Sequence, residues 1–276
     1  RMALGAKCGH GGTLDPLATG LLPIALGAAT KTVPYAMDGR KAYRFRLRWG
    51  EGRDTDDSDG SVIETSDKRP TREEIEAALP AFLGLISQVP PKYSAIKVKG
   101  ARAYDLARED EEFELVARDI QIFRFELAEI IDDDSADFLV DCGKGGYMRS
   151  LARDLGQALG CLGHIAALRR TRVGPFTLDH AQELDYVKTL GRINDACPVL
   201  LPVKTALDDI PALAVSDSEA ADLRNGRTLR LLRKGDLERL PDVDDGKEFR
   251  VEASGRLVGL ARFEAGEVKS SRVLNL

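Results

Sequence analysis

The chain has 276 residues, of which 43% are hydrophobic and 31% charged, the composition of an ordinary globular protein with enough residues for a large core and two domains. It contains no run of about 18 apolar residues and no signal peptide, so we expect no membrane span and no membrane partner. The few cysteines and histidines are scattered, at no metal-binding or disulfide spacing. We therefore expect no metal site, no disulfide framework and a reducing, cytoplasmic compartment. The cysteines are Cys8, Cys142, Cys161 and Cys197.

The distribution of charge is more informative than its sum. The net charge of −5 argues at first against a nucleic-acid partner. However, residues 1–48 carry a net charge of +6 and residues 144–172 one of +5, which leaves −16 for the remaining residues. An acidic protein with two basic segments can still present a positive groove to phosphates. Basic runs of this kind are equally typical of solvated faces.

The first informative stretch is a loop at residues 9–20, with the sequence GHGGTLDPLATG. Its glycines permit a positive φ or a close approach of another backbone, and Pro16 keeps Asp15 out of the α region. The apolar run at residues 21–26 predicts a buried strand or core segment directly after it. We therefore expect Asp15 to be a rigidly held carboxylate at the edge of a core, suited to a nucleophile or an acid–base group. The Asp-Pro pattern alone is also typical of a simple turn.

Residues 9–23, GHGGTLDPLATGLLP, closely resemble the active-site motif of the bacterial tRNA pseudouridine-55 synthases, the TruB family. In that family the Asp of the motif is the nucleophile that acts on a uridine in the T-loop of tRNA. The resemblance implies this role for Asp15. It also implies that His10 fills the gap left in the RNA by the flipped base, although His10 alone fits an ordinary turn histidine.

The next segments predict a short helix and a strand. Residues 28–37 are expected to form a helix that Pro34 keeps short. Residues 41–49, KAYRFRLRW, alternate strictly between apolar and basic side chains, which predicts a strand with one buried face. Tyr43 lies on that face and would ordinarily be a core residue. The resemblance implies that it packs against the target uracil and takes part in the proton transfer at C5.

An acidic run and a capped helix follow. The run DTDDSDG at residues 54–60 does not have the spacing of an EF-hand loop, so we expect a solvated turn near the rim of the site, without a metal. Thr71 and Glu74 have the spacing of a capping box, which predicts a helix with an apolar stripe directly after Thr71.

Residues 88–100 predict an extended hairpin that leads into a helix over residues 101–109. Basic side chains alternate there with Tyr93 and Tyr104. This combination suits RNA, because bases stack on aromatic rings and phosphates need cations. A plain surface hairpin is the alternative. The segment at about residues 86–110 resembles the RNA-gripping thumb insertion of the family.

Alternating patterns over residues 115–142 predict two strands joined by an acidic turn. The glycine-rich break at residues 143–146 then precedes a helix that begins at Tyr147. Arg149 is the natural counter-ion of Asp15, because an adjacent guanidinium orients a carboxylate and keeps it ionised. On sequence grounds alone it equally fits an exposed helix charge.

The family motif at this turn is usually Lys-Gly-Thr-Tyr-x-Arg, and here Gly146 replaces the Thr. The resemblance implies that Arg149 partners Asp15 and that Tyr147 is a wall of the uracil pocket. The basic segment at residues 163–174 resembles the Leu-Arg-Arg element of the family, which implies that Leu168 contacts the nucleotide. Arg169 and Arg170 are candidates for phosphate or structural contacts, and His164 is expected to be structural.

The last part of the chain predicts a second, smaller domain. A capped helix near residues 216–225 and short strands with tight turns predict a small β-barrel, which resembles the PUA-type RNA-binding domain. The expected fold class is α+β: a mixed, largely antiparallel sheet core flanked by helices, with a small C-terminal β-barrel (PUA-like) domain. We expect a pseudouridine synthase catalytic domain over residues 1–205 and a PUA-like RNA-binding domain over residues 206–276.

The implied function is isomerisation of uridine to pseudouridine at position 55 in the T-loop of tRNA, by base flipping and with Asp15 as the nucleophile. No redox step occurs, so no cofactor is expected. The expected partner is the T-arm stem-loop of tRNA, with the protein acting as a monomer. The sequence leaves open whether Asp15 attacks C1′ or the uracil ring.

Three alternatives remain at this point. The first is a related synthase that works with a guide-RNA complex, which the compact thumb and the lack of basic tails disfavour. The second is a non-enzymatic RNA-binding protein, and the third a carboxylate-dependent hydrolase, which would need a second acid. The chain also departs from the family in one respect: it begins too late to include the N-terminal strand with a Lys-Pro-x-Gly element that is normal for the family.

Overall fold

The computed structural model describes residues 7–94, 96–98, 101–102, 113, 115–190, 197, 199–231, 235, 238–241 and 246–274. The chain divides into two units, each formed by segments that are distant in sequence. The core unit comprises residues 13–22 and 38–179, and the terminal unit comprises residues 1–12, 23–37 and 180–276.

The core unit is built on a seven-stranded sheet with the order β13-β12-β4-β11-β10-β7, in which β2 also pairs with β12. Only the pairing of β2 with β12 is parallel, and the others are antiparallel. The strands are β2 (Ala18–Gly20), β4 (Lys41–Trp49), β7 (Gly84–Gln88), β10 (Arg118–Asp132), β11 (Ser135–Cys142), β12 (Gly163–Val173) and β13 (Phe176–Thr177).

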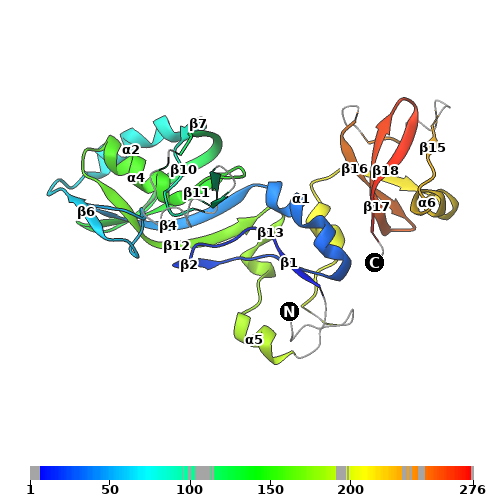
Figure 1. The fold of residues 1–276 in the computed structure, drawn as a ribbon, viewed down its shortest axis with the longest axis horizontal. Coiled ribbons are helices and arrows are strands. Elements are labelled where there is room, and N and C mark those ends of the chain that lie inside the picture. Colours follow the sequence, from blue (N-terminus) through cyan, green and yellow to red (C-terminus); the bar gives the residue numbers. More distant parts are fainter. Residues whose placement is uncertain are drawn as a thin grey trace. The chain divides into compact units, whose positions relative to one another are not determined.

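The core lies on one face of this sheet, where α2 (Arg72–Ala78) and α4 (Met148–Ala158) cover it (Figure 1). The strict alternation in β4 buries Tyr43, Phe45, Leu47 and Trp49, none of which is more than 9% exposed. Phe45 stands opposite Phe138 of β11, with ring centroids 5.4 Å apart. Burial of each such ring contributes about 1.5–3 kcal/mol. The core therefore fixes the strands that flank Asp15.

Two small hairpins and a 3-10 turn complete the core unit. The hairpins pair β5 (Glu51–Arg53) with β6 (Val62–Thr65) and β8 (Lys97–Val98) with β9 (Ala101–Arg102). The 3-10 turn Leu79–Phe82 directly follows α2.

The terminal unit contains a five-stranded sheet with the order β14-β16-β17-β18-β15. Its strands are β14 (Ala212–Val215), β15 (Leu229–Arg230), β16 (Glu248–Ala253), β17 (Arg256–Glu264) and β18 (Glu267–Val273), with α6 (Asp217–Arg224) between the first two. The same unit includes β1 (Cys8–His10), β3 (Ile24–Leu26), the 3-10 turns Gly27–Thr32 and Val203–Leu207, helix α5 (Leu184–Thr189) and all but the last residue of helix α1 (Val33–Asp38). The 3-10 turn Leu178–His180 begins in the core unit and ends in the terminal unit.

The α+β class with a small C-terminal PUA-like sheet domain is confirmed. The strand over residues 41–49, the two strands β10 and β11, and both capped helices are also confirmed. Thr71 and Ser216 each form the expected capping box, with Glu74 and Glu219. The division into domains at residue 205 stays a prediction.

Three local predictions are wrong. The acidic turn at residues 54–60 is not fully solvated, because Asp56 and Asp57 are only 8% and 4% exposed. Ala101 begins no helix: it belongs to β9, and the rest of the helix predicted over residues 101–109 lies outside the described residues, as does Tyr104. In the apolar run at residues 21–26, Ile24 is 52% exposed and is therefore not a core residue.

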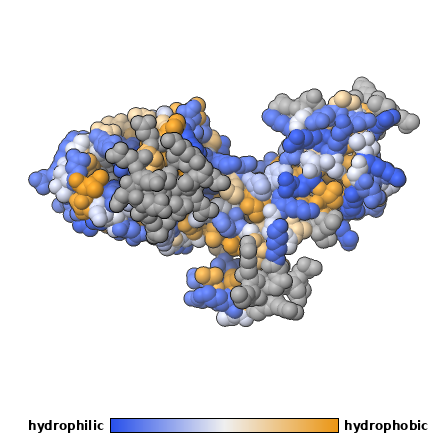
Figure 2. Space-filling model, in the orientation of Figure 1, coloured by the Kyte–Doolittle hydropathy of each residue, from blue (hydrophilic) through white to orange (hydrophobic). Residues whose placement is uncertain are grey.

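Within the described residues, no helix is long and apolar enough to cross a membrane. The face of the molecule in Figure 2 is mainly hydrophilic, with separate small apolar patches.

Candidate active site

Asp15 lies in a loop that ends at β2, and this strand is fastened to β12. Gly20 has a φ of +94° and lies so close to β12 that a Cβ atom would be 2.2 Å from the carbonyl oxygen of Arg170. Only glycine fits that position. Within the loop, the amide of Ala18 donates to the carbonyl of Asp15 over 2.9 Å, which closes a turn. The glycine and the turn explain the local sequence, which places one carboxylate at the edge of the sheet.

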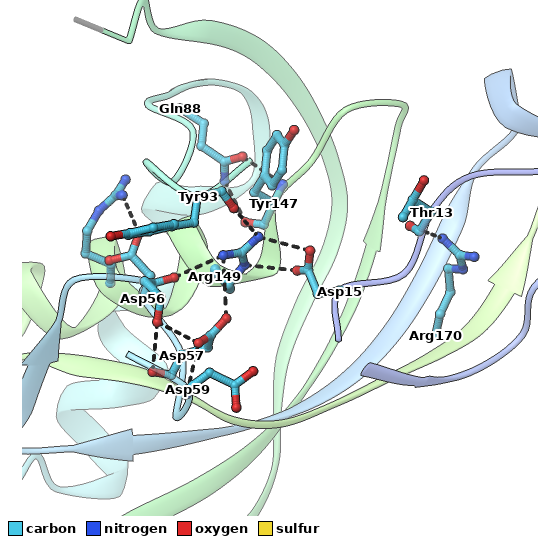
Figure 3. A network of polar contacts seen from close by, with 12 residues as sticks. Thr13, Asp15, Asp56, Asp57, Asp59, Gln88, Tyr93, Tyr147, Arg149 and Arg170 are labelled. Carbon is cyan, nitrogen blue, oxygen red and sulfur yellow. Dashed lines mark hydrogen bonds and ion pairs between the residues drawn. The ribbon is translucent and has the colours of Figure 1, made fainter. Parts of the chain in front are cut away.

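Arg149 binds Asp15 with two hydrogen bonds. Its Nε and Nη2 donate to the two carboxylate oxygens of Asp15, each over 2.9 Å (Figure 3). Arg149 comes from the first turn of α4, and it is 4% exposed although it is charged. Paired, bidentate geometry fixes the plane of a carboxylate as well as its position. The structure therefore brings together two residues, 134 positions apart, whose pairing the family resemblance implied.

The other donors of the Arg149 guanidinium are also used. Nη2 donates to the carbonyl of Tyr93 over 2.9 Å, and Nη1 donates to the carbonyl of Thr55 over 3.1 Å. Nη1 also lies 3.5 Å from a carboxylate oxygen of Asp57. Because every side of the fork has a partner, the guanidinium is held in one orientation. It can then hold Asp15 without reorganisation.

The two carboxylates beside Arg149 differ in accessibility. The side chain of Asp57 is 5% exposed, and its Oδ1 accepts from the hydroxyl of Thr55 over 2.6 Å and from the amide of Asp59 over 3.1 Å. The side chain of Asp15 is 30% exposed. Asp15 is therefore the carboxylate of this pair that a substrate can reach, and Asp57 is an internal counter-ion.

Two tyrosines lie within the electrostatic influence of Asp15. Burial raises the pKa of Tyr43 to about 12, with Asp15 acting in the same direction and the Arg170 guanidinium opposing it. Burial also raises the pKa of Tyr147, and Asp15 adds to that shift as well. Both phenols are therefore neutral at physiological pH. They offer an apolar ring with a hydroxyl donor, as a pocket for an aromatic base requires.

Gln88 holds the backbone of Tyr147. Its Oε1 accepts from the Tyr147 amide over 2.9 Å, and its Nε2 donates to the Tyr147 carbonyl over 3.1 Å. Tyr147 is the N-cap of α4 and provides no side-chain cap of its own. Gln88 is 1% exposed, at the end of β7. This buried amide therefore fixes the start of the helix that bears Arg149.

A second ion-pair network anchors the acidic turn to α4. Arg153 donates to Asp56 over 2.8 Å, to Asp154 over 2.9 Å and to the carbonyl of Val89 over 2.8 Å. Burial raises the pKa of Asp56 to about 6, against the opposing charge of Arg153. Asp56 also has a positive φ of 61°, which is uncommon for a residue other than glycine. The turn is thus held in the conformation that presents Thr55 and Asp57 to Arg149.

The remaining predicted residues lie in two places. Leu168 is 6% exposed on β12, opposite Phe45 of β4. His10 lies on β1 in the terminal unit and is exposed, and its role in the site stays a prediction. Arg170 is 2% exposed and donates a hydrogen bond to the loop that bears Asp15. Of the two roles expected for Arg170, a phosphate contact or a structural contact, this position favours the structural one.

His164 is a structural histidine, as expected. It is 1% exposed, its Nδ1 lies 3.2 Å from the carbonyl oxygen of Glu51, and burial lowers its pKa. Among the described residues, no cluster of His, Cys, Asp or Glu is arranged to hold a metal.

Sequence reasoning missed Asp56, Asp57 and Gln88. The acidic run was visible, but charge spacing alone does not distinguish a solvated turn from one that is neutralised by buried arginines. Gln88 gave no signal, because a single amide beside Val89-Pro90 is unremarkable in sequence.

The chain matches two family models along most of its length. Residues 1–148 match the TruB family pseudouridylate synthase (N terminal domain), and residues 149–208 match the tRNA pseudouridylate synthase B C-terminal domain. These matches define the class of the protein: it is an enzyme, a pseudouridylate synthase.

Relatives named tRNA pseudouridine synthase B are similar over nearly the whole chain. The protein from Gluconacetobacter diazotrophicus is 56% identical, covering 97% of this chain and 88% of its own length. The protein from Bradyrhizobium diazoefficiens is 53% identical, covering 98% and 78%. The protein from Caulobacter vibrioides is 51% identical, covering 98% and 87%. The chain belongs to the TruB family of pseudouridylate synthases.

Solved structures show the same fold at lower identity. An H/ACA RNP bound to a substrate RNA containing 2'-deoxyuridine matches with a TM-score of 0.72 and 23% identity, over 98% of this chain and 77% of that one. A Cbf5-Nop10-Gar1 complex matches with a TM-score of 0.72 and 23% identity, over 97% and 76%.

Proposed function

We propose that this protein converts the uridine at position 55, in the T-loop of tRNA, to pseudouridine, with Asp15 as the nucleophile. The observation that supports this most strongly is the bidentate pair of Asp15 with a buried Arg149, in which the carboxylate stays partly open. The relatives named tRNA pseudouridine synthase B support tRNA as the substrate.

The reaction is an isomerisation in which atoms and charge balance within the substrate. The N1–C1′ bond breaks, the base turns, a C5–C1′ bond forms, C5 loses its proton and N1 gains one. Asp15 supplies the electron pair that attacks either C1′ or the uracil ring, and it is released at the end. Both routes need an ionised, oriented carboxylate, which is what the Arg149 fork favours.

The target base must leave its stack to reach Asp15. Tyr43 and Tyr147 then hold the detached uracil, Leu168 contacts the nucleotide, and His10 fills the gap left in the RNA. Because Tyr43 has a pKa of about 12, it meets the base as a neutral phenol. Its part at C5 is therefore to relay a proton: its oxygen takes the proton from C5 while its own hydroxyl proton passes to solvent, since it does not begin as a phenolate base.

The same observations weigh on the alternatives. A two-carboxylate hydrolase is disfavoured, because its second carboxylate must reach a water or the leaving group of the substrate. Asp57, the described carboxylate nearest to the Asp15–Arg149 pair, is buried beside Arg149 and cannot do so. A guide-RNA enzyme is disfavoured by the identity of about half the residues with tRNA pseudouridine synthase B proteins. A tRNA substrate supports a cytoplasmic location, and we propose that the protein acts there as a monomer.

Asp15→Asn tests the proposal directly. The amide keeps the size of the side chain but is no nucleophile, so the variant is expected to bind an unmodified T-arm transcript and to form no pseudouridine. Pseudouridine is measured by primer extension after carbodiimide treatment, and affinity by filter binding, without guide RNA. Asp59→Asn, a change of an exposed carboxylate in a neighbouring turn, is the matched control and should retain activity. Product formation by Asp15→Asn would rule the proposal out.

A further inference from the structure

Arg149 orients the carboxylate of Asp15, but the loop that bears Asp15 needs its own support. This loop, residues 13–21, is joined to the sheet through the short strand β2, which pairs with only three residues of β12. Three residues form a weak ladder. The position of the Asp15 backbone therefore depends on further contacts.

Arg170 of β12 supplies contacts at both ends of this loop. Its Nε donates to the carbonyl of Leu21 over 2.8 Å, and its Nη1 donates to the carbonyl of Thr13 over 3.4 Å. Thr13 and Leu21 lie on either side of Asp15 in the sequence. Figure 3 shows the two arginines on opposite sides of Asp15, with Arg149 at its carboxylate and Arg170 at the loop backbone.

The backbone of Arg170 contacts the same loop. Its carbonyl accepts from the amide of Leu21 over 2.8 Å. A Cβ atom on Gly20 would lie 2.2 Å from that carbonyl oxygen and 2.9 Å from the Arg170 nitrogen. Both the side chain and the main chain of Arg170 thus hold the loop close to β12.

Arg170 also lies beside Tyr43. The two are directly opposite each other in the pairing of β12 with β4, so their side chains share a face of the sheet. The positive charge of Arg170 and its hydrogen bond to Tyr43 both lower the pKa of that phenol. One buried guanidinium therefore contacts the loop of the proposed nucleophile and a wall of the proposed base pocket.

The chemistry of this contact needs arginine. Arg170 is 2% exposed, and a charge buried this far is costly unless hydrogen bonds satisfy it. The planar fork of a guanidinium can reach two carbonyls at once, whereas the ammonium of lysine is a single point on a flexible stem.

We propose that Arg170 is a positioning residue that sets the location of Asp15 by holding both ends of loop 13–21 on β12. The inference rests on the proposed role of Asp15. In this role Arg170 does not touch the substrate, and its loss displaces the nucleophile from the reacting atom. A displacement of about 1 Å costs on the order of 100-fold in rate.

Arg170→Lys tests the inference by separating chemistry from binding. We expect the single-turnover rate at saturating enzyme to fall about 100-fold, while the affinity for T-arm RNA changes by less than about threefold, which is below one kcal/mol. The matched control is Arg172→Lys on the same strand. Arg172 donates to the carbonyl of Gly174 over 2.7 Å and makes no described contact with loop 13–21, so this variant should keep the normal rate.

A second variant distinguishes the loss of this contact from a general loss of folding. Gly20→Ala disturbs the same contact from the side of the loop without changing Arg170. If both residues act on the position of Asp15, the double variant will be slowed much less than the product of the single effects. Amide exchange should also become faster in residues 13–21 of Arg170→Lys and stay unchanged in α4.

Two results would overturn the inference. One is a rate for Arg170→Lys equal to that of Arg172→Lys. The other is a parallel loss of RNA affinity and rate with unchanged exchange in loop 13–21. Failure of the proposed function is recognised separately, because it would appear as activity of Asp15→Asn whatever the result at Arg170.

Discussion

At the scale of single residues, the site depends on arginines that are buried among carboxylates and carbonyls. Arg149 is 4% exposed and Arg170 2% exposed, and each is satisfied by groups from distant segments. Removing one partner from such a pair leaves an uncompensated charge, which costs more than the pair contributes. Substitutions at the partners are therefore expected to be more harmful than their small size suggests.

The pKa of Asp56 leads to a pH prediction. Burial raises this pKa to about 6, whereas an unfolded Asp has a pKa of about 3.9. Between these values the folded protein holds the proton more tightly than the unfolded chain. The contribution of this group to stability is therefore full below about pH 4 and is lost as the pH rises through about 6.

Asp56→Asn removes this dependence. Relative to the variant, the wild-type protein should lose about 2 kcal/mol of free energy of unfolding between pH 4.5 and pH 7. Urea unfolding of both proteins across that range measures the difference, and other titrating groups cancel in the comparison. A difference that stays constant with pH would show that Asp56 titrates normally.

At the scale of elements, the start of α4 is the piece that organises the site. Tyr147 and Arg149 both lie there, and Gln88 of β7 bonds to both backbone groups of Tyr147. Ser150 and Arg153 of the same helix donate to the carbonyl of Val89. The end of β7 therefore serves as an external cap for α4.

Gln88→Ala should loosen this cap. It leaves the amide of Tyr147 without its described partner, whereas the carbonyl of Tyr147 still accepts from the amide of Leu151 over 3.1 Å. We therefore expect a loss of about 1–3 kcal/mol in the free energy of unfolding. Turnover should also fall in protein that remains folded, because Arg149 is two residues away. Gln121→Ala on the neighbouring strand β10 is the control. The side-chain amide of Gln121 makes one described hydrogen bond, to the carbonyl of Ile122 over 3.5 Å, so its loss should cost less than about 1 kcal/mol. Equal effects of the two substitutions, in denaturant unfolding and in activity, would contradict this role.

Sequence patterns predicted the elements better than the contacts between them. Periodicity two in residues 41–49 and the capping boxes at Thr71 and Ser216 were sufficient, because they are local signals. The burial of Asp56 and Asp57 was not predictable, because it depends on arginines about 95 positions away. The pairing of Arg149 with Asp15 came from a family resemblance, and residue spacing alone would have left Arg149 as a surface charge.

At the scale of the whole molecule, segments from both ends of the chain form one unit. The hydroxyl of Tyr35 donates to Glu248 over 2.7 Å, and Tyr35 also packs on the cluster formed by Leu207, Leu257, Leu260 and Leu274. Residues 23–37, which follow the Asp15 loop, therefore pack with the C-terminal sheet. The predicted boundary at residue 205 could not reveal this, because the two partners are 213 positions apart.

A crystal structure of the Asp15→Asn protein with an unmodified T-arm stem-loop tests the central claim most directly. The target uridine should be flipped out between Tyr43 and Tyr147, with its C1′ or ring carbon about 3–3.5 Å from the side chain at position 15. A uridine that stays stacked in the loop, or that binds out of contact with position 15, would contradict the assignment of Asp15 as the nucleophile.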